Sequence, residues 1–314
     1  MTEASSRRPR FERSHEAPAF HITERDMEII KQVYKHRFLR SDQIAALCGG
    51  SPRNILRRLQ LLYHARFLDR PRAQIDYYRQ NGNQTMVYAL GNRGADVLSA
   101  RFSIPRRKID WQAKNHSAKR PFLQHTLLVA EVMLKLETGS KRANVRIIDS
   151  EEILAQCPEE TKHRHNPFKW NVRCSYNGVP LSLGVHPDKV FGLHFQDQNN
   201  PAYFFLEADR ATMPVAREGF ERTSLFRKML AYQESWKQGL HERHFNIRRF
   251  CVLIVTTSQA RIKTLLEANR QFSQGKGSRL FLFADTSFLN SENTLTAPLL
   301  NGASESTTLL DIIQ

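Results

Sequence analysis

The sequence predicts two folded domains, an α+β domain near the N-terminus followed by an α/β domain built on a mixed sheet. Its 314 residues suffice for two cores, and 40% hydrophobic with 25% charged residues is typical of globular proteins. In the first third, three segments with helical spacing of apolar residues precede two strand-like runs. Further along, short apolar runs alternate with amphipathic helical segments, which is the pattern of a sheet covered by helices.

The positive charge is concentrated in the first domain. The chain has a net charge of +16. Residues 1–120 hold 24 Lys and Arg against 11 Asp and Glu, a balance of +13, whereas residues 121–314 hold 23 against 20, a balance of +3. Such an uneven distribution predicts that the first third binds a polyanion, and double-stranded DNA is the leading partner. A membrane partner is not expected, because no basic amphipathic helix has a wide apolar face.

Cysteines and the N-terminal segment favour a cytoplasmic location. Four scattered cysteines do not suggest a disulfide framework, and the polar first 17 residues lack the apolar core of a signal peptide.

Cys157, His163, His165 and Cys174 fall within 18 residues, but without the paired close spacing of structural zinc sites. We therefore expect that loop to contact phosphate rather than zinc.

The first domain, residues 20–104, follows a disordered basic arm over residues 1–19 that contains Arg7 and Arg8. Thr23 can cap a first helix, and a short second helix is predicted over 42–47. After a Gly-Gly turn, Ser51-Pro52 is a typical start for a third helix that ends near His64. These three segments have the order and spacing of a helix-turn-helix.

The third helix has one apolar and one polar face. At about 100° per residue, the apolar face is formed by Ile55, Leu56, Leu59, Leu62 and Tyr63. The residues opposite are Arg53, Asn54, Arg57 and Gln60, with Arg58 on the flank. Arg, Asn and Gln side chains bind guanine, adenine and phosphate, so this face is the expected DNA-reading surface.

A wing is predicted after the third helix. Two strand-like runs over 75–79 and 86–90 are joined through Asn81-Gly82, a strong hairpin signal. Three helices and a hairpin make a winged helix-turn-helix, with Asn81 at the wing tip and a fourth helix over 92–100 behind it. The alternative is a helical core domain whose arginines are only solvated. Residues 105–122 then form a basic linker in which Arg106, Arg107 and Lys108 would contact phosphates.

The second domain is predicted over residues 123–285. A polar tail over residues 286–314 is predicted to follow it. Its expected elements are a helix at 123–137, a strand at 145–148, an insert at 149–183, a central hairpin, a helix at 215–239, a strand at 250–256, a helix at 259–271 and a strand at 280–284. The hairpin strands are expected over 184–192 and 203–209, with a turn at 196–201.

The central hairpin would bring three carboxylates together. Asp188 lies on the first strand, and Glu207 and Asp209 lie on the second. Neighbouring carboxylates repel one another unless a cation lies among them, which predicts a site for Mg²⁺ or Mn²⁺. In the alternative interpretation, Asp188 caps a strand and the other two face solvent.

This order of elements is similar to the core of restriction-endonuclease-like folds, the PD-(D/E)xK nucleases. The resemblance implies catalytic and metal-binding roles for Asp188 and Glu207, and a fourth metal ligand at Glu131 on the first helix. The usual Glu-x-Lys is replaced by Glu207-Ala208-Asp209, so Asp209 occupies the lysine position. Lys228, one helix later, could supply the missing lysine, or could be an ordinary surface residue.

The two domains together resemble the replication-relaxation family over residues 20–285. The resemblance rests on residues 88–94, the helix with His125 and Glu131, the pair Pro187-Asp188, and residues 205–210. It implies a DNA-binding accessory protein of plasmid or mobile-element replication and DNA relaxation, whose partners include replication or mobilisation proteins. Two alternatives remain open, an active Mg²⁺-dependent endonuclease or nickase and a winged-helix transcriptional repressor. A homodimer is compatible with each of them.

Overall fold

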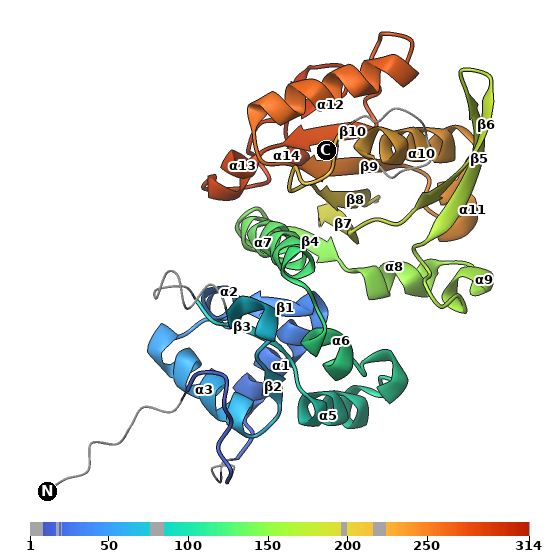
Figure 1. The fold of residues 1–314 in the computed structure, drawn as a ribbon. Coiled ribbons are helices and arrows are strands. Elements are labelled where there is room, and N and C mark those ends of the chain that lie inside the picture. The colour runs from blue at the N-terminus through green and yellow to red at the C-terminus, as the bar shows by residue number, and fades with distance from the viewer. Residues whose placement is uncertain are drawn as a thin grey trace, which may run out of the picture. The chain divides into compact units, whose positions relative to one another are not determined.

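The computed structural model describes residues 9–16, 19, 21–75, 85–195, 200–215 and 224–313 (Figure 1). The chain divides into two compact units, Met1–Glu131 and Val132–Gln314. The boundary falls inside helix α7, Arg120–Arg142, rather than before it. In the first unit, Leu123 of this helix packs with Phe38, Val87 and Ala89.

The three predicted helices of the first unit are confirmed as α1 (Glu24–His36), α2 (Ser41–Cys48) and α3 (Pro52–His64). Thr23 and Asp26 form a capping box at the start of α1, because each side chain bonds the backbone N–H of the other. Gly49 and Gly50 adopt φ angles of 66° and 86° between α2 and α3, a region that favours glycine.

A three-stranded antiparallel sheet completes this unit. Its strands are β1 (Phe38–Arg40), β2 (Leu68–Asp69) and β3 (Val87–Leu90), and β3 lies in the centre. Residues 72–74 form the 3₁₀ helix η1, and the Gln74 side chain bonds both the N–H and the C=O of Val87. Most of the predicted wing, including Asn81, lies outside the described residues, so the winged helix stays a prediction.

The expected basic linker over 105–122 is wrong, because this segment is folded into the first unit. After α5 (Asn92–Phe102), it forms the 3₁₀ helix η2 (Arg106–Lys108) and α6 (Gln112–His116). Ile109 is buried in the core of the unit, and Trp111 stacks on Tyr34 with ring centroids 5.6 Å apart. Two apolar anchors among many charged residues are enough to fix a short segment to a core.

The second unit contains a mixed sheet, as predicted, and this sheet has seven strands. Its order is β12-β11-β10-β9-β8-β7-β4. The strands are β4 (Val145–Ile148), β7 (Lys189–Phe195), β8 (Ala202–Ala208), β9 (Phe250–Val255), β10 (Phe281–Ala284), β11 (Leu299–Asn301) and β12 (Ser306–Thr307). Strands β8, β9 and β10 are parallel, and every other neighbouring pair is antiparallel.

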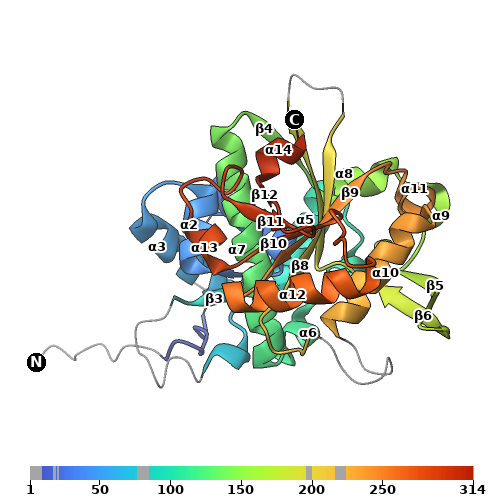
Figure 2. The ribbon, with the colours of Figure 1, turned by 90° about the horizontal axis from the view of Figure 1, so that it is seen from above.

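Helices α10 (Leu225–Lys237) and α12 (Gln259–Phe272) lie side by side on one face of the sheet (Figure 2). They bury Phe205, Val252 and Phe281 in the core of this unit. Shorter helices complete the unit: α8 (Ser150–Gln156), α9 (Glu159–Lys162), α11 (Leu240–Phe245), α13 (Thr286–Asn290) and α14 (Leu309–Ile313). Among the described residues, no helix combines the length and apolar character needed to cross a membrane.

The insert over 149–183 forms regular secondary structure. Besides α8 and α9 it contains a hairpin of β5 (Trp170–Tyr176) and β6 (Val179–Val185), which extends away from the main sheet (Figure 1). The strand expected over 184–192 is therefore two strands. β6 ends at Val185, and β7 starts at Lys189 after a break that contains Asp188.

Two other boundaries also differ from the prediction. The helix expected over 215–239 begins at Leu225, capped by Ser224, and ends at Lys237 before Gly239 at φ 63°. Residues 216–223 lie outside the described part of the chain. The expected polar tail is wrong, because its β11 and β12 extend the sheet and its Leu295, Leu299 and Leu309 are buried.

Candidate functional site

Asp188, just before β7, and Glu207, on β8, lie at the same end of the β7–β8 pair. Lys189 is paired with Leu206, so Asp188 and Glu207 occupy adjoining positions. The backbone N–H of Asp188 donates to Leu206 O over 2.9 Å, and the N–H of Ala208 donates to Asp188 Oδ2 over 2.8 Å. The strand pairing thus holds the Asp188 carboxylate beside Glu207, as the sequence predicted.

Helix α10 supplies two partners for Glu207. Lys228 Nζ donates to Glu207 Oε2 over 2.6 Å, and the Tyr232 hydroxyl donates to Oε1 over 2.7 Å. Lys228 and Tyr232 are four residues apart and therefore share one face of the helix. We call Asp188, Glu207, Lys228 and Tyr232 the carboxylate–lysine site.

Burial controls the ionisation of this site. Glu207 is 3% exposed, and the loss of water raises its pKa to about 7, although Lys228 acts in the opposite direction. Burial alone would lower the pKa of Lys228, but the Glu207 and Asp188 carboxylates hold it above its usual value. Burial, together with Glu207, raises the pKa of Tyr232 well above its usual value, so its hydroxyl remains a donor. Burial therefore raises the pKa of Glu207, while Lys228 and Tyr232 donate hydrogen bonds to its two oxygens.

Asp209 is not part of this arrangement. Its Oδ2 accepts hydrogen bonds of 2.8 Å from both Arg261 Nε and the Thr256 hydroxyl, and its Oδ1 accepts from the N–H of Ala211. Asp209 is 7% exposed, so this is a buried ion pair with α12. Arg261 offsets the negative charge of Asp209, which relieves part of the repulsion expected from three adjacent carboxylates.

Glu131 is also engaged by protein groups. Arg40 Nη2 and Gln43 Nε2 donate to its Oε2 over 2.7 and 2.6 Å, all within the first unit. This network ties α7 to the start of α2. A metal-binding role for Glu131 would have to use Oε1 or displace one of these donors from Oε2.

The donor set suits a magnesium ion only in part. Within the part of the chain that the structure describes, no three His, Cys, Asp or Glu residues are grouped to hold a metal ion. Mg²⁺ is commonly held by one or two carboxylates together with substrate phosphates, and Asp188 and Glu207 could supply that pair. Cys157 is buried, with its Sγ directed at the carbonyl oxygens of Ile153 and Phe245, which does not favour the zinc alternative.

The polar face of α3 forms a second candidate site. The residues expected from the sequence to read DNA, Arg53, Asn54, Arg57 and Gln60, are all exposed, whereas Ile55 and Leu59 on the other face are fully buried. Among the described residues, no ion pair or hydrogen bond occupies the Arg53 or Arg57 side chain. We call these four residues the α3 polar face.

Two residues of α3 differ from the sequence prediction. Arg58 Nε donates to Asp26 Oδ1 over 2.8 Å, and its Nη2 donates to Asp26 Oδ2, so Arg58 neutralises a fully buried carboxylate. This engagement removes Arg58 from the expected DNA contacts. Leu56 is 50% exposed rather than buried, because it lies about 100° around the helix from Ile55. It therefore borders the α3 polar face.

The basic residues of η2 differ in whether an ion pair engages their side chains. Arg106 is held by Asp96 at 2.8 Å and by Asp110 at 3.4 Å. Arg107 and Lys108 are exposed, so only these two remain open to phosphate.

Tyr232 and Arg261 are site residues that the sequence did not predict. The spacing of Lys228 and Tyr232 could have identified Tyr232, since residues four apart share a helix face. For Arg261 the sequence offers no comparable signal, because Asp209 lies 52 residues away along the chain. Its pairing depends on α12 packing over the end of β8.

Comparison with known proteins places the chain in a family. Neither the search of curated proteins nor the search of solved structures gave a match. A family model described as replication-relaxation matches residues 30–249, which span the α3 polar face and the carboxylate–lysine site. Because that match covers well over half of the sequence, the chain belongs to the replication-relaxation family.

Proposed function

We propose that the protein is a duplex-DNA-binding accessory factor of plasmid or mobile-element replication and DNA relaxation. Family membership supports the role in replication or relaxation. The observation that carries DNA binding is the α3 polar face, where Arg53 and Arg57 are exposed and unengaged within the described residues. A helix that buries one face and presents Arg, Asn and Gln on the other has the chemistry of major-groove readout.

The charge of the chain supports the same role. Residues 1–120 carry a balance of +13, which raises the rate of encounter with DNA. Exposed Arg107 and Lys108 add contacts that suit phosphates rather than bases. In this proposal the α3 polar face provides sequence preference, while the other basic residues provide affinity that falls with salt.

The carboxylate–lysine site would serve DNA contact or structure rather than efficient cleavage. Both oxygens of Glu207 already accept hydrogen bonds from Lys228 and Tyr232. Asp209, in the position of the usual catalytic lysine, is bound by Arg261. Cation binding at this site has to compete with a buried ion pair.

Duplex binding tests the main proposal. The full chain should bind linear duplex DNA, and the double variant Arg53→Ala/Arg57→Ala should lose most of that affinity. Arg243→Ala/Arg248→Ala is the matched control, because it removes the same charge and both residues are also exposed but lie in the second unit. Equal losses in the two variants would show that only overall charge matters, and would reject recognition by α3.

An Mg²⁺-dependent endonuclease is the second candidate. The observation in its favour is the convergence of Asp188, Glu207 and Lys228 in one site. In that case Asp188 and Glu207 would hold Mg²⁺ or Mn²⁺, which would supply Lewis-acid chemistry, and Lys228 would position the attacking water. Nicking of supercoiled plasmid by the wild type, lost in Glu207→Gln, would establish this activity.

A further inference from the structure

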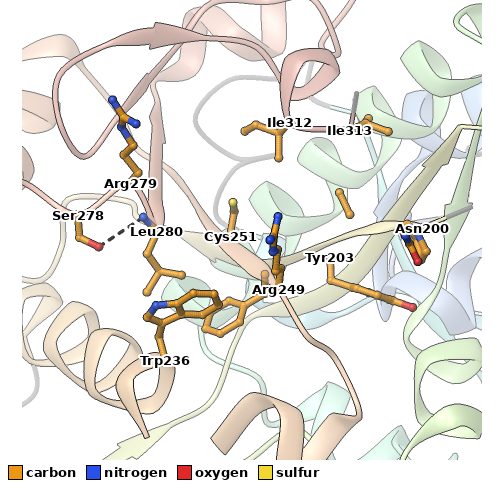
Figure 3. A pocket seen from close by; sticks show the side chains of 13 residues that line it. Asn200, Tyr203, Trp236, Arg249, Cys251, Ser278, Arg279, Leu280, Ile312 and Ile313 are labelled. Carbon is orange, nitrogen blue, oxygen red and sulfur yellow. Dashed lines mark hydrogen bonds between the residues drawn. The ribbon is translucent and has the colours of Figure 1, made fainter. Parts of the chain in front are cut away.

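A pocket of about 810 Å³ lies in the second unit, away from the carboxylate–lysine site (Figure 3). It opens where the parallel strands β8, β9 and β10 begin, since Tyr203, Phe250 and Leu280 line it. Glu207 lies four residues further along β8 than Tyr203, which is about 13 Å. Trp236 is eight residues beyond Lys228 on α10, which is about 12 Å. The spacing along β8 and the spacing along α10 thus both separate this pocket from the carboxylate–lysine site.

One wall of the pocket is aromatic and apolar. Trp236 is 38% exposed, stacks on His241 and meets Phe250 edge to face. The apolar lining is completed by Tyr203, Leu280, Ile312 and Ile313. An exposed indole that is held flat by a second ring is a surface on which another planar group can stack.

The polar lining is positive. Arg249 and Arg279 line the pocket, and none of its lining residues is acidic. Arg249 is exposed and has no ion pair within the described residues, and in Figure 3 its side chain lies between those of Trp236 and Tyr203. Arg279 pairs with Glu305 at the surface over 2.6 Å. Burial raises the pKa of Cys251 to about 11, so this thiol adds no charge at neutral pH.

We propose that this pocket binds a nucleotide, with the base stacked on Trp236 and the phosphate bound by Arg249. An inorganic anion would leave the aromatic wall unused, and an apolar ligand would leave the Arg249 guanidinium without a partner. A nucleotide satisfies both, and the pocket has the volume typical of small-ligand sites. The nucleotide is either free or part of a DNA strand. The proposal does not rest on duplex binding by the first unit.

Tryptophan fluorescence of the full chain tests this proposal. Thymidine 5′-monophosphate should quench the emission saturably. Trp236→Phe should abolish the change, because Trp170 is buried and Trp111 stacks on Tyr34 in the first unit, outside the pocket. Arg249→Gln should weaken binding by about tenfold or more, as expected for loss of a charge-assisted bond. Arg248→Gln is the matched control, since Arg248 is the exposed neighbour that does not line the pocket.

Further probes separate the parts of the ligand and its source. Thymidine without phosphate should bind more weakly, and inorganic phosphate alone should not quench. Oligo-thymidylate, titrated in the Arg53→Ala/Arg57→Ala background, distinguishes a DNA strand from a free nucleotide. Absence of saturable quenching with either nucleotide probe in folded protein would overturn the proposal. Equal losses in Arg249→Gln and Arg248→Gln would overturn it as well, because they would indicate only non-specific attraction.

Discussion

Lys228 Nζ lies 2.6 Å from Glu207 Oε2, in a site where Glu207 is 3% exposed. The two residues come from different layers of the second unit, β8 and α10, and their ion pair joins the sheet to the helix that covers it. Any role of Glu207 in binding a cation or DNA must compete with this pair. Its stability and its titration therefore offer direct tests of the site.

Lys228→Met should lower the free energy of unfolding by about 3 kcal/mol, because it leaves the Glu207 carboxyl buried without its cation. The double variant Glu207→Gln/Lys228→Met should be more stable than Lys228→Met alone, since no charge then remains to be compensated. Urea denaturation of the wild type, Lys228→Met, Glu207→Gln and the double variant measures the coupling. A Lys228→Met protein as stable as the wild type would contradict a buried ion pair.

The stability of the protein should fall as pH rises from about 4.5 to about 7 through the contribution of Glu207. Its pKa is about 7 in the folded chain against an ordinary value of 4.5, so the folded state binds more protons within that window. Above the window the contribution becomes constant. Glu207→Gln should flatten this part of the profile, whereas Glu267→Gln, an exposed control, should not. Unfolding free energies measured across this pH range show whether stability falls or rises with pH.

Arg57→Ala should relax the sequence preference for DNA by about 1–3 kcal/mol while leaving the fold intact. Its neighbour provides the matched contrast. Arg58→Ala should instead destabilise the fold by about 3 kcal/mol, because it strips the fully buried Asp26 of its partner. Competition binding against scrambled duplex, together with thermal denaturation, separates the two effects. The reverse pattern would place Arg58, not Arg57, on the DNA.

Leu56 should contribute an apolar contact to the proposed DNA interface. It is 50% exposed and lies one turn from Gln60 at the edge of the α3 polar face, where a thymine methyl group could meet it. Replacing thymine by uracil in the preferred duplex should weaken wild-type binding, and Leu56→Ala should remove that difference. If both duplexes bind the wild type equally well, DNA binding stands but this contact does not.

Millimolar Mg²⁺ or Mn²⁺ should raise the melting temperature of the wild type if Asp188 and Glu207 accept a cation. Asp188→Asn should lose that increase, while Glu267→Gln should keep it. We expect binding without efficient nicking of supercoiled plasmid, because Glu207 is engaged by Lys228 and Tyr232. A wild type with no metal-dependent shift would show that these carboxylates do not form a metal site.

Much of the fold follows from local patterns in the sequence. Features within a few residues mark the limits of helices. The capping box at Thr23 starts α1, the Gly-Gly turn ends α2, and Pro52 starts α3. The central strands β8, β9 and β10 are short apolar runs in the sequence. Such runs are typical of buried parallel strands. The convergence of Asp188 and Glu207 was predictable as well, because hairpin pairing places neighbouring strand residues together.

By itself, then, the sequence determined the helices of the first unit, the mixed sheet of the second and the pairing that places Asp188 beside Glu207. Only the tertiary structure decided which charges neutralise one another: Arg58 with Asp26, Arg261 with Asp209, and Arg40 with Glu131. These partners lie 32, 52 and 91 residues apart. Periodicity reports only which face of an element a side chain occupies, whereas an ion pair forms when two faces meet in the folded chain, and that meeting depends on the packing of the whole unit.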